Sequence, residues 1–130
     1  RTFWEKATAI HVFCRQAKMR GNRFARHWHD LLRLAATERI QNSLADKSWL
    51  EQVVRHKTMF FQEKDQAGTP IDYRECLNGH LCLVPEGAAR ETLRDDYNSM
   101  IQDGILLVQA PEFDVILEEC AHLEAMINSH

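Results

Sequence analysis

The chain has 130 residues, of which 45% are hydrophobic and 27% are charged, with five glycines and three prolines. This composition is typical of one globular domain, and it excludes collagen-like, low-complexity and largely disordered chains. No apolar run approaches the roughly 20 residues that a membrane-spanning helix needs, and the N-terminus lacks a signal-peptide pattern, so we expect a cytoplasmic protein without a membrane partner.

The net charge of −3 conceals an asymmetry along the chain. Residues 1–34 contain eight Lys or Arg and two acidic residues, a balance of +6, whereas residues 35–130 contain eight basic and seventeen acidic residues, a balance of −9. Such a concentration of positive charge is self-repulsive in the absence of a counter-ion. The first quarter of the chain is therefore expected to bind an anion.

The first two predicted helices lie in this basic region. Residues 2–18 contain no helix breaker, and an apolar stripe at helical spacing runs through Phe3, Ala7, Ile10 and Cys14. After a break at Gly21-Asn22, with Asn22 as the expected N-cap, a second stripe runs through Phe24, Trp28, Leu31 and Ala35. These two segments are predicted to form a helical hairpin.

The middle of the chain predicts two further helices. Ser48-Trp49-Leu50-Glu51 fits a capping box at the start of a helix, whose apolar positions we assign to Trp49, Val53, Phe60 and Phe61. Thr69-Pro70 is a start signal for a short helix, and Asn78-Gly79 is a matching stop signal.

Two longer helices are predicted in the last third of the chain, from about Ala88 to Gln102 and from Pro111 onward. The apolar segments 81–84 and 105–109 are short enough to be either helical or extended, so a two-stranded ribbon between them stays an open alternative. The predicted fold class is all-α: a single helical domain over 1–130, with about five to six helices.

The four cysteines form no C-x-x-C pair, and we expect them to be reduced. Cys76, His80 and Cys82 lie close together in sequence, but a fourth zinc ligand at regular spacing is missing. His27 and His29 point about 200° apart on a helix and cannot chelate one metal. We therefore predict no metal site, and we favour packing over base stacking for four aromatic residues at core spacing: Trp28, Trp49, Phe60 and Phe61.

Lys6 and Asp30 are the candidate functional residues. Lys6 interrupts the edge of the first apolar stripe, which is explained either by snorkelling of its ammonium to water or by an anionic ligand. Asp30 has Arg26 at i−4 and Arg33 at i+3, and each such pair would contribute about 0.2–0.5 kcal/mol. Those pairs leave Arg23 and the other nearby cations unexplained, so we predict a phosphate group here, whose oxygens match the guanidinium forks.

The chain resembles the AbiEii/AbiGii-type nucleotidyltransferase toxins of toxin–antitoxin and phage-exclusion systems. Four stretches carry the resemblance, and the first two are the more specific: RTFWEK at 1–6, RHWHDLLRL at 26–34, VVRHKTMFF at 53–61 and LCLVP…LRDDYNSMI at 81–101. They look like the C-terminal part of such proteins. By this resemblance Lys6 corresponds to the active-site lysine, and Arg26 and Asp30 to the R-x-x-x-D motif. The implied catalytic residues are Lys6 and Asp30. From the cluster of cations around Asp30 we further predict that Arg23, Arg26 and Arg33 bind the nucleotide phosphates.

The resemblance also implies an NTP substrate, Mg²⁺, a cognate antitoxin and an acceptor, which in some relatives is the 3′ end of tRNA. The family's Gly-Ser motif and its Asp-x-Asp pair are both absent from this sequence, and Asp95-Asp96 is adjacent rather than spaced. Because phosphoryl transfer depends on carboxylate-held metal, we expect an inactive, metal-free C-terminal part of a longer enzyme. The start at Arg1 fits a partial chain. The alternative is a non-catalytic module that binds RNA or a partner protein through residues 1–34.

Overall fold

The structure is a computed structural model that describes residues 2–18, 24–37, 44, 46–104 and 111–129. These residues form five α-helices and one short 3₁₀ helix: α1 (Thr2–Gln16), α2 (Arg26–Ala35), α4 (Ser48–Phe60), η1 (Tyr73–Cys76), α5 (Gly87–Gln102) and α6 (Phe113–Asn128). No strand occurs in these ranges, and the predicted all-α class is confirmed. Segment 105–109 of the alternative ribbon lies outside the described residues. No described helix has the length and apolarity that crossing a membrane requires.

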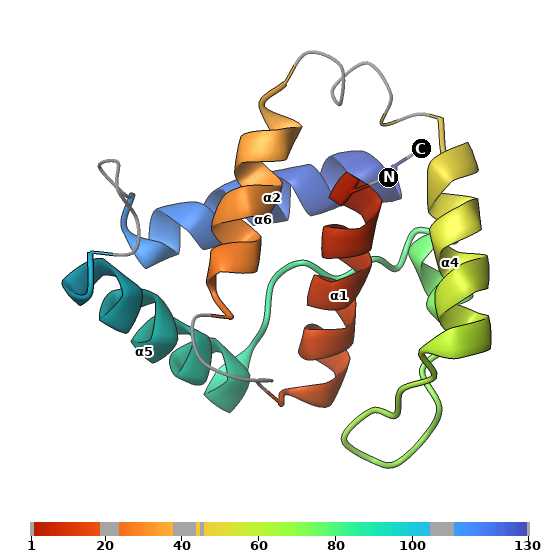
Figure 1. Ribbon diagram of the computed structural model, residues 1–130, viewed down its shortest axis with the longest axis horizontal. Coiled ribbons are helices and arrows are strands. Elements are labelled where there is room, and N and C mark those ends of the chain that lie inside the picture. The colour runs from red at the N-terminus through yellow and green to blue at the C-terminus, as the bar shows by residue number, and fades with distance from the viewer. Residues whose placement is uncertain (1, 19–23, 38–43, 45, 105–110, 130) are drawn as a thin grey trace.

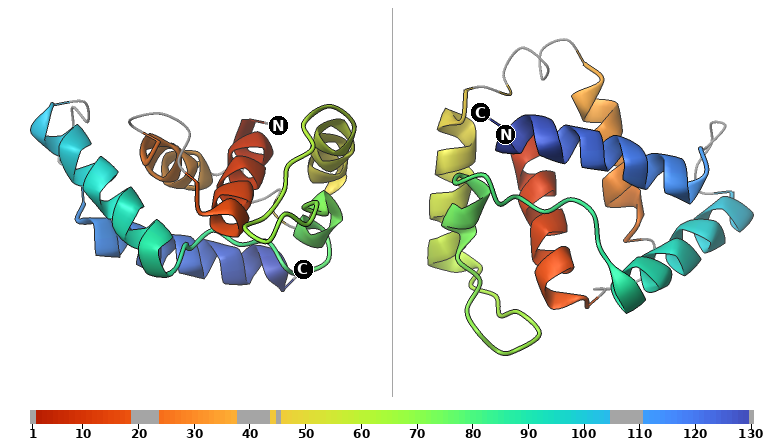
Figure 2. Two further views of the ribbon diagram at one scale, coloured as in Figure 1. Left: turned by 90° about the horizontal axis from the view of Figure 1, so that it is seen from below. Right: turned by 180° about the vertical axis from the view of Figure 1, so that it is seen from behind.

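Helix α1 lies at the centre of the arrangement, with α2 on one side and α4 on the other (Figure 1). The helices α1 and α2 run in opposite directions, as the predicted hairpin requires. Helix α6 crosses behind α1 and α2, and α5 packs against α6 (Figures 1 and 2). The helices α2, α1 and α4 therefore form one layer, and α6 covers one side of it.

The apolar stripes meet in one core. Trp28 and Leu31 of α2 are fully buried against α1, whose stripe contributes Phe3, Ala7 and Ile10, while Cys14 is only partly buried. Helix α6 buries one face, formed by Phe113, Ile116, Leu117, Cys120, Leu123 and Ile127. Burial of this apolar surface is the main favourable contribution to folding. All four cysteines are free thiols, as expected from their spacing.

Helix α4 begins at Ser48 as predicted, but its predicted capping box does not form, and the short helix begins later than Thr69-Pro70. In both places a nearby aspartate accepts a backbone N–H. Helix α4 has Lys47 as its N-cap, and the Ser48 N–H donates to Asp46 Oδ1 at 3.0 Å, so the predicted capping box does not form. The short helix begins at Tyr73 because the Asp72 carboxylate accepts the Arg74 N–H. Thr69-Pro70 instead lies in a tight loop, in which the Asp65 N–H donates to the Thr69 carbonyl at 2.9 Å.

The start of α2 also differs from the prediction. Ala25 is the N-cap residue and has no side-chain cap of its own, while the predicted cap, Asn22, lies outside the described residues. Asp96 of α5 supplies the missing acceptor, since its Oδ2 lies 2.7 Å from the Ala25 nitrogen. A distant carboxylate thus satisfies a backbone donor at the start of α2.

The aromatic residues of the α4 region do not all pack in the core. Trp28 is buried as predicted, but Trp49, Phe60 and Phe61 are 48%, 65% and 56% exposed. The buried face of α4 is formed by Leu50, Val53 and Val54 instead. The packing prediction is therefore wrong for three of the four aromatic residues, which leaves their rings at the surface.

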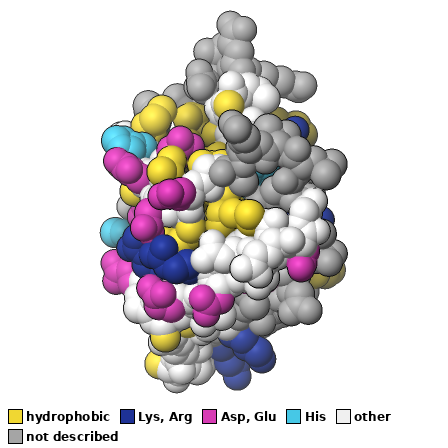
Figure 3. Space-filling view, turned by 90° about the vertical axis from the view of Figure 1, so that its left-hand side faces the viewer, with side chains coloured by type: hydrophobic (Ala, Val, Ile, Leu, Met, Phe, Trp, Pro, Cys, Tyr) yellow, Lys and Arg dark blue, Asp and Glu magenta, His cyan; other side chains and the backbone are white. Residues whose placement is uncertain are grey.

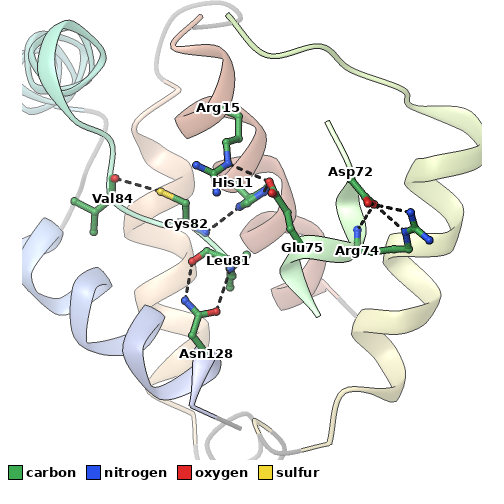
Figure 4. Close-up of polar contacts among 9 residues, drawn as sticks. All are labelled: His11, Arg15, Asp72, Arg74, Glu75, Leu81, Cys82, Val84 and Asn128. Atoms are coloured by element: carbon green, nitrogen blue, oxygen red, sulfur yellow. Dashed lines mark hydrogen bonds and ion pairs between the residues drawn. The ribbon is translucent and has the colours of Figure 1, made fainter. Parts of the chain in front are cut away.

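Segment 81–84 is extended but has no partner strand among the described residues; helix side chains satisfy its backbone (Figure 4). Asn128 Oδ1 accepts the Leu81 N–H at 3.0 Å, and Asn128 Nδ2 donates to the Leu81 carbonyl at 2.9 Å. The Cys82 N–H donates to His11 Nδ1 at 2.9 Å, and Trp28 Nε1 donates to the Leu83 carbonyl at 2.9 Å. These bonds replace the ladder that a neighbouring strand would supply.

His11 is completely buried and joins three parts of the chain (Figure 4). Because Nδ1 accepts the Cys82 N–H, the ring proton lies on Nε2, which donates to Glu75 Oε1 at 2.5 Å. Glu75 also accepts a hydrogen bond from Arg15 Nε at 3.0 Å. Burial lowers the pKa of His11 from its ordinary value of 6.5, although the Glu75 carboxylate opposes this shift.

The surface on the left of Figure 1 carries acidic and basic side chains side by side (Figure 3). Here the Arg94 guanidinium lies 2.8 Å from Asp114 Oδ1 and that of Arg90 lies 3.6 Å from the same atom, which joins α5 to the start of α6. Exposed pairs of this kind contribute little to stability.

The lowered pKa of His11 predicts a loss of stability in acid. The unfolded chain takes up a proton at about pH 6.5, whereas the folded chain does so only at lower pH, so the free energy of unfolding falls as pH decreases below about 6.5. Urea titrations between pH 7.5 and 5 should show a smaller fall for His11→Gln than for the native chain. His122→Gln, at an exposed position, is the control and should behave like the native chain. An equal fall in all three proteins would contradict the assignment.

Loss of the Asn128 amide should destabilise the fold at any pH. Asn128→Ala leaves the buried N–H and carbonyl groups of Leu81 without partners, and each such group costs about 1–3 kcal/mol. We expect the free energy of unfolding to fall by about 2–4 kcal/mol in urea titrations. Asn98→Ala, at an exposed position of α5, should change it by less than about 0.5 kcal/mol.

Candidate functional site

Lys6 and Asp30 lie together between α1 and α2. The Lys6 Nζ atom is 3.5 Å from Asp30 Oδ2, and the two side chains are 24% and 29% exposed. Packing of α1 against Trp28 and Leu31 brings the two helices close enough for this contact. The ammonium of Lys6 therefore meets a carboxylate at the edge of the core while staying accessible to water.

Asp30 is surrounded by basic groups of its own helix. Arg26 Nε lies 3.9 Å from Asp30 Oδ2, and His29 Nδ1 lies 3.9 Å from Oδ1. The expected pair with Arg33 is not formed, because Lys6 lies beside the carboxylate from the neighbouring helix. Among the described residues no acidic group pairs with Arg33, and Arg23 lies outside them.

A pocket of about 350 Å³ opens beside this contact. It is lined by Thr2, Lys6, Asp30, Arg33, Leu34 and Thr37, so both helices contribute. Lys6 and Arg33 outnumber the single carboxylate in the lining, and Arg26 adds a further positive charge next to it. Guanidinium and ammonium groups in this arrangement form strong, charge-assisted hydrogen bonds with phosphate oxygens.

Two histidines of α2 adjoin the site. The Nδ1 atoms of His27 and His29 are buried and have no hydrogen-bond partner in the described part of the chain. Burial lowers the pKa of His27, and the charges of Lys6 and Arg26 lower it further, while Asp30 opposes them. His27 is therefore neutral at pH 7 and adds no charge to the basic cluster.

Sequence reasoning missed part of the pocket lining. Thr2 and Thr37 were not identified as site residues, although Thr2 lies one helical turn before Lys6 and is expected on the same face of α1. Thr37 follows the end of α2, and its hydroxyl donates to the Leu34 carbonyl at 2.8 Å. No local pattern in the sequence marks its position at the pocket.

The residues of the pocket do not fit a Mg²⁺ ion. Mg²⁺ is held by oxygen ligands and usually by one or two carboxylates, yet the single carboxylate here lies against Lys6 and Arg26. No group of three or more His, Cys, Asp or Glu side chains that could hold a metal occurs among the described residues. The charged side chains of this pocket, two cations and one paired carboxylate, are therefore a poor set of ligands for Mg²⁺.

Opposite charge changes in the pocket should alter anion binding in opposite directions. Lys6→Ala removes a cation and should weaken the binding of inorganic tripolyphosphate, whereas Asp30→Asn removes a repulsive charge and should strengthen it. Each change should be about two- to tenfold at low salt, given the size of charge interactions near a surface. Calorimetric titration measures both, with Asp95→Asn on α5 as the control for Asp30→Asn. Weaker binding by the Asp30→Asn variant would contradict an electrostatic anion site.

Comparison with known proteins shows that the sequence matches one family model. The family described as "Nucleotidyl transferase AbiEii toxin, Type IV TA system" matches residues 1–119. Searches among curated proteins and among solved structures found no match. The matched range includes α1 and α2, and with them Lys6, Asp30 and the pocket between them. The chain therefore belongs to the AbiEii nucleotidyltransferase toxin family.

Proposed function

We propose that this chain is the helical part of an enzyme that transfers a nucleotide from an NTP to an acceptor, and that Lys6 and Asp30 belong to its active site. The observation that carries the proposal is the contact between Lys6 Nζ and Asp30 Oδ2, at 3.5 Å, in an open basic pocket. Membership of a nucleotidyltransferase family supports an NTP as the ligand of that pocket.

The reaction requires positive charge near the phosphates. A hydroxyl oxygen of the acceptor attacks the α-phosphorus of the NTP and forms a new P–O bond, the bond to the departing diphosphate breaks, and the hydroxyl proton is released to water. Negative charge shifts onto the diphosphate, and a fixed cation lowers the energy of that transition state. We assign this role to Lys6, with Arg26, Arg33 and Arg23, which belongs to the same basic cluster in the sequence, binding the phosphates.

Asp30 acts on the reaction through Lys6. A carboxylate repels phosphate, so its value in this pocket lies in holding the ammonium of Lys6 in one position at the edge of the α1–α2 contact. The flanking Arg26 reduces the cost of placing a negative charge near an anionic substrate. Asp30 is thus a positioning residue for the catalytic lysine.

The metal-binding carboxylates are proposed to lie elsewhere in the full-length polypeptide. The Mg²⁺ that such enzymes use would neutralise phosphate charge, and this chain contains no Asp-x-Asp pair to hold it. We therefore propose that the 130 residues alone do not transfer nucleotides. For the complete enzyme we propose RNA as the acceptor, with tRNA 3′ ends as the first candidate, and control by a cognate antitoxin.

Substitution of either site residue in the full-length protein tests the proposal. Lys6→Ala and Asp30→Ala should each lower the transfer of labelled nucleotide to RNA by about a hundredfold or more, because loss of one preorganised charge in an active site costs roughly 10²–10³ in rate. Circular dichroism and thermal unfolding should stay close to native, since a partly exposed ion pair contributes at most about 1 kcal/mol.

The matched controls are Lys64→Ala and Asp95→Asn, neither of which lines the pocket. Both should retain native transfer rates. Undiminished transfer by Lys6→Ala would refute the active-site role, and RNA binding without any transfer by the native full-length protein would favour a non-catalytic binding module.

A further inference from the structure

A second pocket lies between α1 and α4, next to the Lys6 site. This groove has a volume of about 430 Å³, within the range of small-molecule sites. Its lining is largely apolar and aromatic, with a few charged groups: Glu5, Ala9, Val12, Phe13, Gln16, Lys18, Phe24, His56, Lys57, Phe61, Glu63 and Tyr73. The groove has no part in the phosphate chemistry proposed for the Lys6 pocket.

One wall of the groove carries two aromatic rings, those of Phe61 and His56, that are not buried in the core. Phe61 is 56% exposed, and its ring centroid lies 5.6 Å from that of His56, which is also exposed. The Tyr73 hydroxyl donates to the Phe61 carbonyl at 2.7 Å, so the chain just after α4 is held in place. An exposed aromatic side chain on a fixed backbone is a ready surface for stacking.

A further part of the lining comes from the segment before α2. The Phe24 ring lies 5.3 Å from that of Phe13 on α1 and 4.8 Å from that of His27. Phe24 lines the groove and also contacts His27 of α2, the helix that carries Asp30 and Arg33. Aromatic side chains from α1, from the segment before α2 and from the segment after α4 therefore all line the groove.

The groove and the phosphate pocket are neighbours on α1. Glu5 lines the groove and Lys6 lines the pocket. Lys57, which also lines the groove, donates a hydrogen bond from Nζ to the Glu5 carbonyl at 3.1 Å.

We propose that the groove binds a nucleobase that stacks on Phe61, while the phosphates attached to that nucleotide lie at Lys6 and Arg33. This inference rests on the proposed function, because it uses the same phosphate site. An aromatic, apolar groove beside a cationic pocket matches a nucleotide, which joins a flat ring system to an anion. The base belongs either to the NTP or to the end of the RNA acceptor.

Truncation of Phe61 tests the groove in the full-length protein. Base–aromatic stacking is worth enough that Phe61→Ala should weaken nucleotide binding by roughly five- to a hundredfold. The probes are the four NTPs, a short single-stranded RNA, and inorganic tripolyphosphate, which has phosphates but no base. Tripolyphosphate binding should be unchanged, and Phe61→Tyr should restore binding of the base-containing probe.

Phe60→Ala is the matched control. Phe60 precedes Phe61 and is 65% exposed, but it does not line the groove, so its loss should change the binding of no probe. Weaker NTP binding by Phe61→Ala assigns the groove to the substrate base, and weaker RNA binding assigns it to the acceptor base. Both results support the proposal.

The proposal is overturned if Phe61→Ala binds every NTP and the RNA like the native protein, or if it loses tripolyphosphate affinity to the same extent. Failure of the underlying function has a different signature. In that case Lys6→Ala leaves tripolyphosphate and NTP binding unchanged, whatever Phe61→Ala does.

Discussion

The buried ring of His11 is the constraint on which the position of α1 depends. Its two nitrogens bond to the backbone of segment 81–84 and to Glu75 of η1, so α1 can neither rotate nor slide without breaking a buried hydrogen bond. Trp28 fixes α2 to the same segment through the Leu83 carbonyl. Because an unpaired polar group in the interior is costly, these two side chains set the rotation of both helices.

The rotation of α1 and α2 that these buried bonds fix also determines which side chains lie on the other faces of the two helices. At about 100° per residue, Lys6 lies about 140° from His11 around α1, and Asp30 lies about 200° from Trp28 around α2. Helices anchored to the 81–84 segment therefore direct Lys6 and Asp30 away from it, and the two residues meet beside the α1–α2 contact. The packing of α1 and α2 is therefore sufficient to bring Lys6 and Asp30 into contact.

Local patterns predicted the parts of the structure that depend on helical periodicity. The apolar stripes of α1 and α2 follow from residue spacing. The predicted end of α5 at Gln102 is confirmed, and two residues later Gly104 has a φ of +70°, which favours glycine. The exposure of Trp49, Phe60 and Phe61 was not predictable in this way, because burial of a helix face depends on which distant element covers it. The same limit applies to the capping of α2 by Asp96, 71 residues away.

Part of the candidate site could be predicted from the sequence, and part of it could not. An unexplained lysine on an apolar edge and an aspartate among arginines are local anomalies, and a hairpin is enough to bring them together. The sequence predicted that Arg33 belongs to the phosphate site, but the structure was needed to show that Asp30 pairs with Lys6 across the two helices rather than with Arg33. The position of Lys57 against the Glu5 carbonyl also needed the structure. A cation that the fold leaves without a carboxylate partner binds phosphate at a lower cost than a cation that is already paired, because an existing ion pair must be weakened before its cation can bind a ligand. Arg33, whose guanidinium pairs with no acidic group in the described ranges, is by this reasoning the cation of the pocket whose charge is most available to an anion, whereas the charge of Lys6 is shared with Asp30.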